Sequence, residues 1–211
     1  PYFLIENSFI SDIQVSTPQA GEQDDNQRGP LKNLNGKAII LYAGTFERYQ
    51  GIPLLLQSAL EVVKEFKDAI FVLAGGTESQ VRQMREMAES LAIEKSVIFT
   101  GNLSTGEVSR LVEKAQILVS PRTKGTNTPL KIYSYLHSGK PIVATDLYTH
   151  RQVLNSNVAV LTEANPTAFA EGIKRLLRDS EFRAKIGREA QNYYEAYYGE
   201  KHYKEKLSQL F

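Results

Sequence analysis

AIILYA (38–43) is a short run of apolar and partly β-branched residues, and five similar runs follow it along the chain. All are predominantly apolar, without the alternation of polar and apolar residues that marks a half-exposed strand. Such runs are typical of strands buried on both faces, as in a parallel sheet with helices on each side. The later runs are AIFVLA (69–74), SVIFT (96–100), QILVS (116–120), PIVAT (141–145) and VAVLT (158–162).

The segments between these runs have helical patterns. Apolar residues recur every three or four positions within 52–66, 81–91 and 169–177, which predicts helices with one buried face. Ser104 followed by Glu107 is a capping-box pattern and predicts a helix start. The alternation of strands and helices predicts an α/β fold, a doubly wound, Rossmann-like parallel sheet of about six strands with helices on both faces.

The composition excludes several classes of protein. The 211 residues, 42% hydrophobic and 23% charged, suit one large domain or one domain with appendages. The 25 basic and 24 acidic residues nearly cancel, which argues against a nucleic-acid partner. Because the chain has no cysteine, disulfides, zinc fingers, iron–sulfur centres and thiol nucleophiles are excluded. No apolar run approaches the roughly 20 residues that cross a bilayer.

The two ends differ in composition from the middle. Residues 16–36 are polar and rich in Gly, Asn and Asp, so we expect residues 1–36 to form a connecting segment and a flexible loop. The chain begins at Pro1 within an apolar run, which suggests a fragment of a longer protein. We expect residues 191–211 to form a helical tail that packs back on the core or on the missing N-terminal half of the longer protein. Its aromatic and apolar residues are Tyr193, Tyr194, Tyr197, Tyr198, Tyr203, Leu207, Leu210 and Phe211.

Ligands of such sheets bind at the carboxyl ends of the strands, where helix N-termini attract anions. Four of the five loops that follow the first five strands contain glycine, which permits tight turns and close approach to a ligand. Neither GxGxxG nor a Walker loop is present. The loops are GTFERYQG (44–51), GGTES (75–79), GNLSTG (101–106), PRTKGTNTP (121–129) and DLYTH (146–150).

The fourth loop has the most functional groups. Arg122, Lys124 and Lys131 surround a Gly-Thr-Asn-Thr-Pro sequence that leads into a predicted helix. Thr128 is expected to cap this helix and Pro129 to lie in its first turn. Backbone donors, hydroxyls and cations together predict a site for phosphate or diphosphate. The alternative is an ordinary solvated basic loop.

Other polar residues give weaker signals. His137, His150 and His202 lack metal-ligand spacing, so no protein-held metal is expected. His150 follows a strand and is expected at a cap or on the surface, with ligand contact as the alternative. Glu47 and Asp146 lie in different loops and identify no acid–base pair.

Several ordered motifs resemble the C-terminal half of family 4 glycosyltransferases, which have the GT-B fold. The resemblance covers nearly the whole chain, and its strongest part is the loop and helix around Lys131. The matching stretches are KGTNTPLKIYSYLHSGKPIVATD (124–146), ILVSP (117–121), LYAGTFERYQGIPLLLQSA (41–59), VIFTGNLSTGEVSRLVEKAQILVSP (97–121), VLTEANPTAFAEGIKRLLRDSEFRAKIGREA (160–190) and LIENSF (4–9).

The resemblance implies that residues 37–190 bind a nucleotide-sugar donor, with base and ribose near 75–76 and 101–103. The diphosphate would contact the first glycine loop and the loop before the helix at Lys131. The implied substrate is a UDP- or GDP-sugar, and no cofactor is implied. The implied donor-binding residues are Gly44, Thr45, Arg48, Gln50, Gly75, Gly76, Gly101, Asn102, Arg122, Lys124, Gly125, Thr126, Asn127, Thr128, Pro129, Leu130, Lys131 and Ser134.

The chain departs from the family pattern at four positions. Thr45 and Gln50 stand where the family has an arginine and a lysine that face the diphosphate. Thr126 and Ser134 stand where it has a pair of glutamates, so no catalytic residue is assigned. A serine can still bond a ribose hydroxyl, and neighbouring cations can replace the lost ones. These cations are Arg48, Arg122, Lys124 and Lys131.

The expected function is sugar transfer to a glycan or lipid-linked acceptor with retention, as in polysaccharide biosynthesis. The acceptor would be held by an N-terminal domain of the same polypeptide, without which the chain should be inactive. We expect a cytoplasmic location, with the inner membrane surface as an alternative, and membrane association only in the full-length protein. The other functions considered are a non-catalytic nucleotide-sugar-binding module and half of another GT-B enzyme such as a UDP-sugar epimerase.

Overall fold

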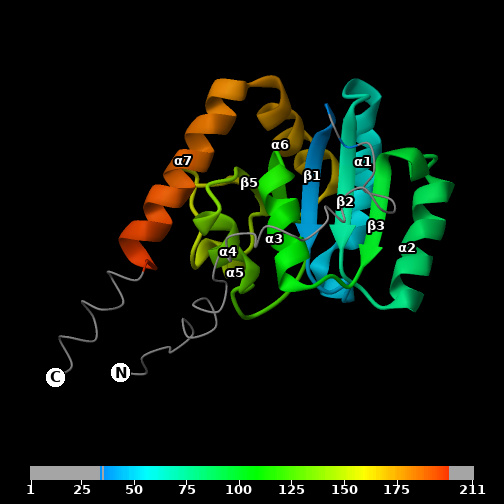
Figure 1. The fold of residues 1–211 in the computed structure, drawn as a ribbon, viewed down its shortest axis with the longest axis horizontal. Coiled ribbons are helices and arrows are strands. Elements are labelled where there is room, and N and C mark those ends of the chain that lie inside the picture. Colours follow the sequence, from blue (N-terminus) through cyan, green and yellow to red (C-terminus); the bar gives the residue numbers. More distant parts are fainter. Residues whose placement is uncertain (1–33, 35, 200–211) are drawn as a thin grey trace, which may run out of the picture. The chain divides into compact units, whose positions relative to one another are not determined.

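A computed structural model of the chain describes residue 34 and residues 36–199. Its centre is the six-stranded parallel sheet that the sequence predicted, and the strands lie in the order β3-β2-β1-β4-β5-β6 (Figure 1). The predicted strand limits are correct to within two residues. The strands are β1 (Ala38–Ala43), β2 (Ala69–Ala74), β3 (Val97–Gly101), β4 (Ile117–Ser120), β5 (Ile142–Thr145) and β6 (Val160–Thr162).

Helices cover both faces of this sheet, which makes it a doubly wound α/β domain. In Figure 1, α3 lies in front of the strands, whereas α1 and α6 lie behind them. The helices are α1 (Ile52–Glu65), α2 (Glu78–Ser90), α3 (Thr105–Lys114), α4 (Lys131–His137), α5 (Tyr148–Arg151), α6 (Pro166–Arg178) and α7 (Ser180–Tyr197), with short 3-10 turns η3 (Arg48–Gln50) and η4 (Glu94–Ser96).

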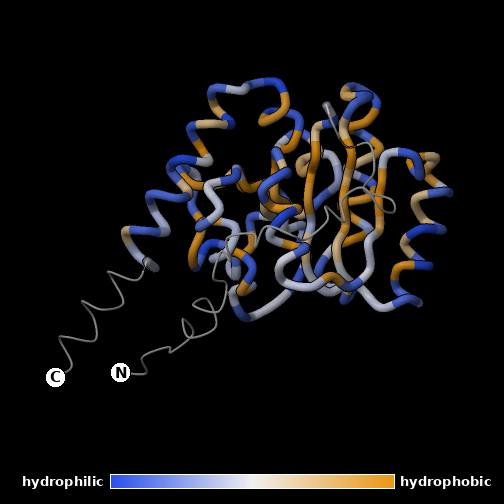
Figure 2. The backbone as a smooth tube through the Cα atoms, viewed as in Figure 1, coloured by the Kyte–Doolittle hydropathy of each residue, from blue (hydrophilic) through white to orange (hydrophobic). Residues whose placement is uncertain are grey.

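The central strands are the most apolar part of the chain (Figure 2). Ile40, Leu41 and Tyr42 of β1 are completely buried, and so are most side chains of β2 and β4. Helices on both faces exclude water from these strands, which explains why the runs lack polar alternation. The predicted capping box is confirmed at α3, where Ser104 accepts from the Glu107 amide and the Glu107 carboxylate accepts from the Ser104 amide.

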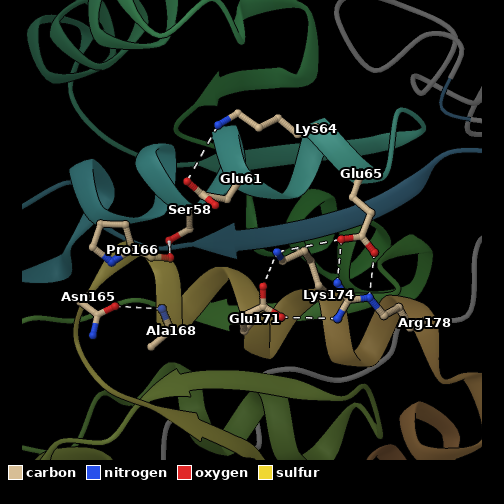
Figure 3. Close-up of polar contacts among 10 residues, drawn as sticks. All are labelled: Ser58, Glu61, Lys64, Glu65, Asn165, Pro166, Ala168, Glu171, Lys174 and Arg178. Atoms are coloured by element: carbon tan, nitrogen blue, oxygen red, sulfur yellow. Dashed lines mark hydrogen bonds and ion pairs between the residues drawn. The ribbon is translucent and has the colours of Figure 1, made fainter.

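Helices α1 and α6 pack together behind the sheet, and polar side chains join them near both ends of the helix pair (Figure 3). The buried Ser58 hydroxyl lies 2.8 Å from the Leu54 carbonyl oxygen and 3.0 Å from that of Pro166. At the other end, Arg178 donates twice to the Glu65 carboxylate, at 2.7 and 2.6 Å. These contacts hold α6 against α1.

Helix α7 packs against α4, and aromatic rings fill their contact. The Tyr133 and Tyr198 ring centroids are 5.0 Å apart, and those of His137 and Tyr194 are 4.8 Å apart. No helix in the described part of the chain is long and apolar enough to cross a membrane. Residues 1–33, 35 and 200–211 lie outside the described residues, so the division into 1–36, 37–190 and 191–211 stays a prediction.

Candidate functional site

The strand order reverses between β1 and β4, which are neighbours in the sheet although 73 residues of sequence lie between them.

 The 73 residues between the two strands, 44–116, build β2 and β3 on one side of this point, and the chain after β4 builds β5 and β6 on the other side. The loops that leave β1 and β4 therefore diverge, and such a reversal point is where doubly wound sheets bind ligands.

These two loops are nevertheless tied together. The Thr123 amide donates to the Tyr49 carbonyl at 2.8 Å. Gly51 has φ +75°, and a β-carbon on it would lie 1.9 Å from the Pro121 carbonyl oxygen. Only glycine permits both this backbone conformation and this approach. The loops after β1 and β4 thus form one continuous surface.

Three glycines continue this surface across the neighbouring strands. The Gly44 amide donates to the Ala74 carbonyl at 2.9 Å, and the Gly75 amide donates to the Gly101 carbonyl at 2.7 Å. Gly44 is exposed, whereas Gly75 and Gly101 are half-buried. The glycines predicted at the strand exits therefore lie side by side.

Lys131, the first residue of α4, extends its ammonium group to this surface. Nζ lies 3.8 Å from the centroid of the Tyr42 ring, and a β-carbon on Gly44 would be 3.2 Å from it. Nζ is buried and has no hydrogen-bond partner within the described residues. Burial, and then the nearby Arg122 guanidinium, lower the pKa of Lys131 to about 7. A buried ammonium without a partner is the arrangement expected where an anion binds.

Arg122 is also buried, with 5% of its surface exposed. Its Nη1 donates to the Asn127 carbonyl at 2.6 Å and its Nη2 donates to the Asn127 side-chain oxygen at 3.3 Å. The guanidinium carbon lies 5.0 Å from the Tyr49 ring centroid, close enough for a cation–π contact. Arg122 therefore closes its own loop, while its Nε is buried without a partner in the part of the chain that the structure describes.

A buried polar network lies beneath Arg122, and the sequence analysis missed it. The His150 ring lies between Ser120 and Thr145, with Nε2 2.9 Å from the Ser120 hydroxyl and Nδ1 2.7 Å from the Thr145 carbonyl oxygen. The Thr145 hydroxyl donates to the Arg122 carbonyl at 2.5 Å. The expected surface or cap position of His150 is wrong, because its side chain is completely buried. The available signal was a hydroxyl residue ending each of two neighbouring strands.

The protonation state of this network follows from its geometry. A carbonyl oxygen only accepts, so His150 Nδ1 carries the proton and Nε2 accepts from Ser120. Burial lowers the pKa of His150 to about 4, with the cations Lys131 and Arg122 acting in the same direction. His150 is therefore a neutral imidazole with one defined tautomer at neutral pH.

The start of α4 differs from the prediction. The helix begins at Lys131, its N-cap is Leu130, and no side chain caps it. The Thr128 hydroxyl instead donates to the Gln152 side-chain oxygen. Pro129 precedes the helix and accepts from the Ile132 amide at 3.0 Å. Thr128 does not cap α4 because Gln152, from the segment after α5, binds its hydroxyl.

The remaining predicted donor-binding residues lie around this surface at different depths. Gln50 lies beside Thr45, with Nε2 3.5 Å from the Thr45 hydroxyl, and its Oε1 is among the buried atoms of the described chain that lack a partner. The buried residues are Gly76, Arg122 and Pro129. The half-buried ones are Gln50, Gly75, Gly101, Thr128, Lys131 and Ser134. The exposed ones are Gly44, Thr45, Arg48, Asn102, Lys124, Gly125, Thr126, Asn127 and Leu130.

The carboxylates of the neighbouring loops are engaged elsewhere. Asp146 forms an ion pair with Arg151, whose hydrogen bonds lower the pKa of that carboxyl group. Glu47 accepts from the Gln80 side-chain amide at 3.3 Å. Over residues 36–199, no three His, Asp or Glu side chains come together in a group that could hold a metal ion. The chemistry that the site offers is thus anion binding by cations and backbone amides.

Comparison with known proteins agrees with this architecture. Residues 23–193 match the family model described as "Glycosyl transferases group 1". The D-inositol 3-phosphate glycosyltransferase of Corynebacterium urealyticum is 24% identical over 181 residues, which cover 82% of this chain and 42% of that protein. The chain spans about half the length of the curated relatives it matches, between 46% and 56% for three of them.

Solved structures show the same fold. Sucrose-phosphate synthase from Thermosynechococcus elongatus has a TM-score of 0.73 at 19% identity, covering 83% of this chain and 45% of that one. Anabaena Alr3699/HepE in complex with UDP and glucose has a TM-score of 0.73 at 17% identity, covering 83% of this chain and 49% of that one. The sheet, its glycine-rich exits and the match over residues 23–193 lead to one assignment: the chain belongs to the group 1 glycosyltransferases.

Proposed function

We propose that this chain is the donor-binding domain of a glycosyltransferase that takes its sugar from a nucleoside-diphosphate sugar. The observation that carries the proposal is the Lys131 ammonium, which is buried next to Gly44 and has no hydrogen-bond partner among the described residues. Arg122 supplies a second positive charge and, at Nε, a buried N–H that has no hydrogen-bond partner within residues 36–199. Two cations at a strand-exit surface suit the two charges of a diphosphate that links a nucleoside to a sugar.

The geometry also supports the placement of the rest of the donor. Gly75 and Gly101 lie next to Gly44 along the strand exits, and these two residues have no side chains of their own to obstruct a nucleoside attached to a diphosphate at Gly44. Anabaena Alr3699/HepE, which shares the fold, was crystallised with UDP-glucose. By this analogy we propose a UDP- or GDP-sugar as donor and a glycan or lipid-linked molecule as acceptor. Retention, the N-terminal acceptor domain and a cytoplasmic location belong to the same proposal.

The proposal is tested by measuring how a substitution of Lys131 changes the affinity of the chain for nucleotides. Calorimetric titration of the chain with UDP, GDP and ADP should show binding of at least one diphosphate, and Lys131→Met should weaken it at least tenfold, the equivalent of about 1.4 kcal/mol. Lys95→Met is the matched control, because Lys95 is exposed in η4 before β3, at the opposite end of the strands. Equal affinity of the Lys131 and Lys95 variants would contradict the proposal.

A second function is favoured by a specific observation. Thr126 and Ser134 occupy the positions at which the family pattern has two glutamates. The carboxylates of Glu47 and Asp146, in the neighbouring loops, contact other side chains. A non-catalytic nucleotide-sugar-binding module needs no carboxylate there. An assay of sugar transfer with the full-length protein separates the two functions, since only the enzyme releases nucleoside diphosphate from its donor.

A further inference from the structure

We propose that Thr145, oriented by His150 and Ser120, is a positioning residue that holds Arg122 at the donor site through the Arg122 main chain. The inference rests on the proposed function, because it assumes that the loop after β4 binds the diphosphate. Ser120, Thr145 and His150 are not among the donor-binding residues that the family resemblance implies.

The Arg122 carbonyl lies outside the regular sheet. The last paired residues of β4 and β5 are Ser120 and Ala144, so no ladder hydrogen bond reaches Arg122. Its carbonyl is instead bonded by the Thr145 hydroxyl, and the next amide, that of Thr123, is bonded by Tyr49 from the loop after β1. The backbone that carries Arg122 is thus held from both sides by single hydrogen bonds.

The Thr145 hydroxyl is itself held in one orientation. Its oxygen lies 3.2 Å from His150 Nδ1, so the ring N–H faces both the carbonyl and the hydroxyl oxygen of this residue. With the imidazole proton on that side, the threonine hydroxyl directs its own hydrogen to Arg122. Ser120 donates to the opposite ring nitrogen and fixes the ring. The hydroxyl hydrogens of Ser120 and Thr145 therefore each have one acceptor, and the imidazole N–H is directed at the two Thr145 oxygens.

The hydrogen bonds between these residues are completely buried, so the loss of any one of them is costly. Ser120, Thr145 and His150 expose no surface to solvent, so water cannot replace a lost hydrogen bond. The other end of Arg122, its guanidinium, holds Asn127 and closes the loop that leads to Lys131. Fixing the carbonyl and the guanidinium of one residue fixes the geometry of this loop before the donor arrives.

The experiment is a double-mutant cycle read by calorimetric titration with UDP, or with GDP if that is the diphosphate which the unmodified chain binds. Thr145→Val removes the hydroxyl at nearly constant shape and should weaken binding about fivefold, the effect of one hydrogen bond. Thr145→Ser should restore affinity to within about twofold. If Thr145 acts through Arg122, Thr145→Val should change affinity less than about twofold when Arg122→Ala is already present.

The controls separate positioning from general stability. Thr162→Val removes the hydroxyl of another strand-end threonine, which bonds only the adjacent Glu163 carbonyl, and should leave affinity unchanged. If Thr145→Val does not fold, Ser120→Ala takes its place in the same cycle, with a loss of affinity in the same direction. Thermal unfolding of each variant shows whether it is folded at the titration temperature.

The outcomes also distinguish the two proposals. An equal loss for Thr145→Val with and without Arg122, or no loss at all, overturns the positioning role. If Lys131→Met then still weakens binding, the proposed function stands without the positioning role. Unchanged affinity in Lys131→Met would instead remove the proposed function, and the positioning role with it.

Discussion

Gly75 lies directly against Gly44, so close that a β-carbon on Gly75 would stand 2.0 Å from the Gly44 carbonyl oxygen. The contact joins the exits of β1 and β2 at the point where the Lys131 ammonium is buried. The backbone conformation of Gly75, φ +118°, is also one that other residues rarely adopt.

Gly75→Ala should therefore be strongly destabilising. Overpacking against the Gly44 carbonyl and the positive φ together predict a loss of about 3 kcal/mol in the free energy of unfolding. Gly101→Ala is the matched control: its φ is +69° and nothing lies within 4 Å of the added carbon, so only about 1 kcal/mol should be lost. Urea denaturation of both variants measures the difference, and equal losses would show that the contact with Gly44 is unimportant.

Diphosphate affinity should decrease as the pH rises. Because the pKa of Lys131 is about 7, the ammonium is mostly charged at pH 6.5 and mostly neutral at pH 8.5. Affinity for a nucleoside diphosphate should fall by about one order of magnitude across this range. Titrations at several pH values check this. Lys131→Arg stays charged throughout, so the same pH dependence in that variant would assign the effect to the ligand or to another group.

Acid should destabilise the chain through His150. The pKa of His150 is about 4 in the folded state and about 6.5 in the unfolded state. Between these values the unfolded chain binds the proton and the folded chain does not, so stability is lost as the pH falls from about 6.5 to 4. The full difference corresponds to about 3 kcal/mol. Urea denaturation at pH 4.5 and 6.5 should show a smaller change for His150→Asn than for the unmodified chain, and equal changes would contradict this.

The packing of helix α7 should contribute to stability mainly through the buried Tyr194, and much less through the exposed Tyr197. Tyr194 is 6% exposed and packs on His137 of α4, whereas Tyr197 is 53% exposed. Tyr194→Ala should cost about 3 kcal/mol of unfolding free energy because it leaves a cavity between α4 and α7. Tyr197→Ala should cost less than about 1 kcal/mol. Similar losses in the two variants would show that the buried ring contributes no special packing.

The sheet was predictable because its signal is local. Apolar runs such as AIILYA (38–43) and the helical spacing between them reflect burial of each segment on its own. The positions of the exit glycines follow from their place directly after strands, whereas the reversal between β1 and β4 is known only from the strand order of the structure. These features placed Gly44, Gly75, Gly101 and Lys131 at one edge before any contact was known.

The predictions that failed depended on contacts between distant residues. Thr128 fits the pattern of a cap, but Gln152 binds its hydroxyl. His150 follows a strand like many surface residues, yet it bonds Ser120, thirty positions earlier, and becomes buried. Local patterns carry no information on such pairings.

The adjacency of β1 and β4 has a consequence for how the chain acquires its binding surface. Residues 38–101 contain three strands that pair with one another, but the Lys131 and Arg122 side chains join Gly44 only after β4 has docked on the far edge of β1. The surface therefore forms only once β4 pairs with β1, and a nascent chain that stops before residue 117 holds half a sheet and neither of these two cations.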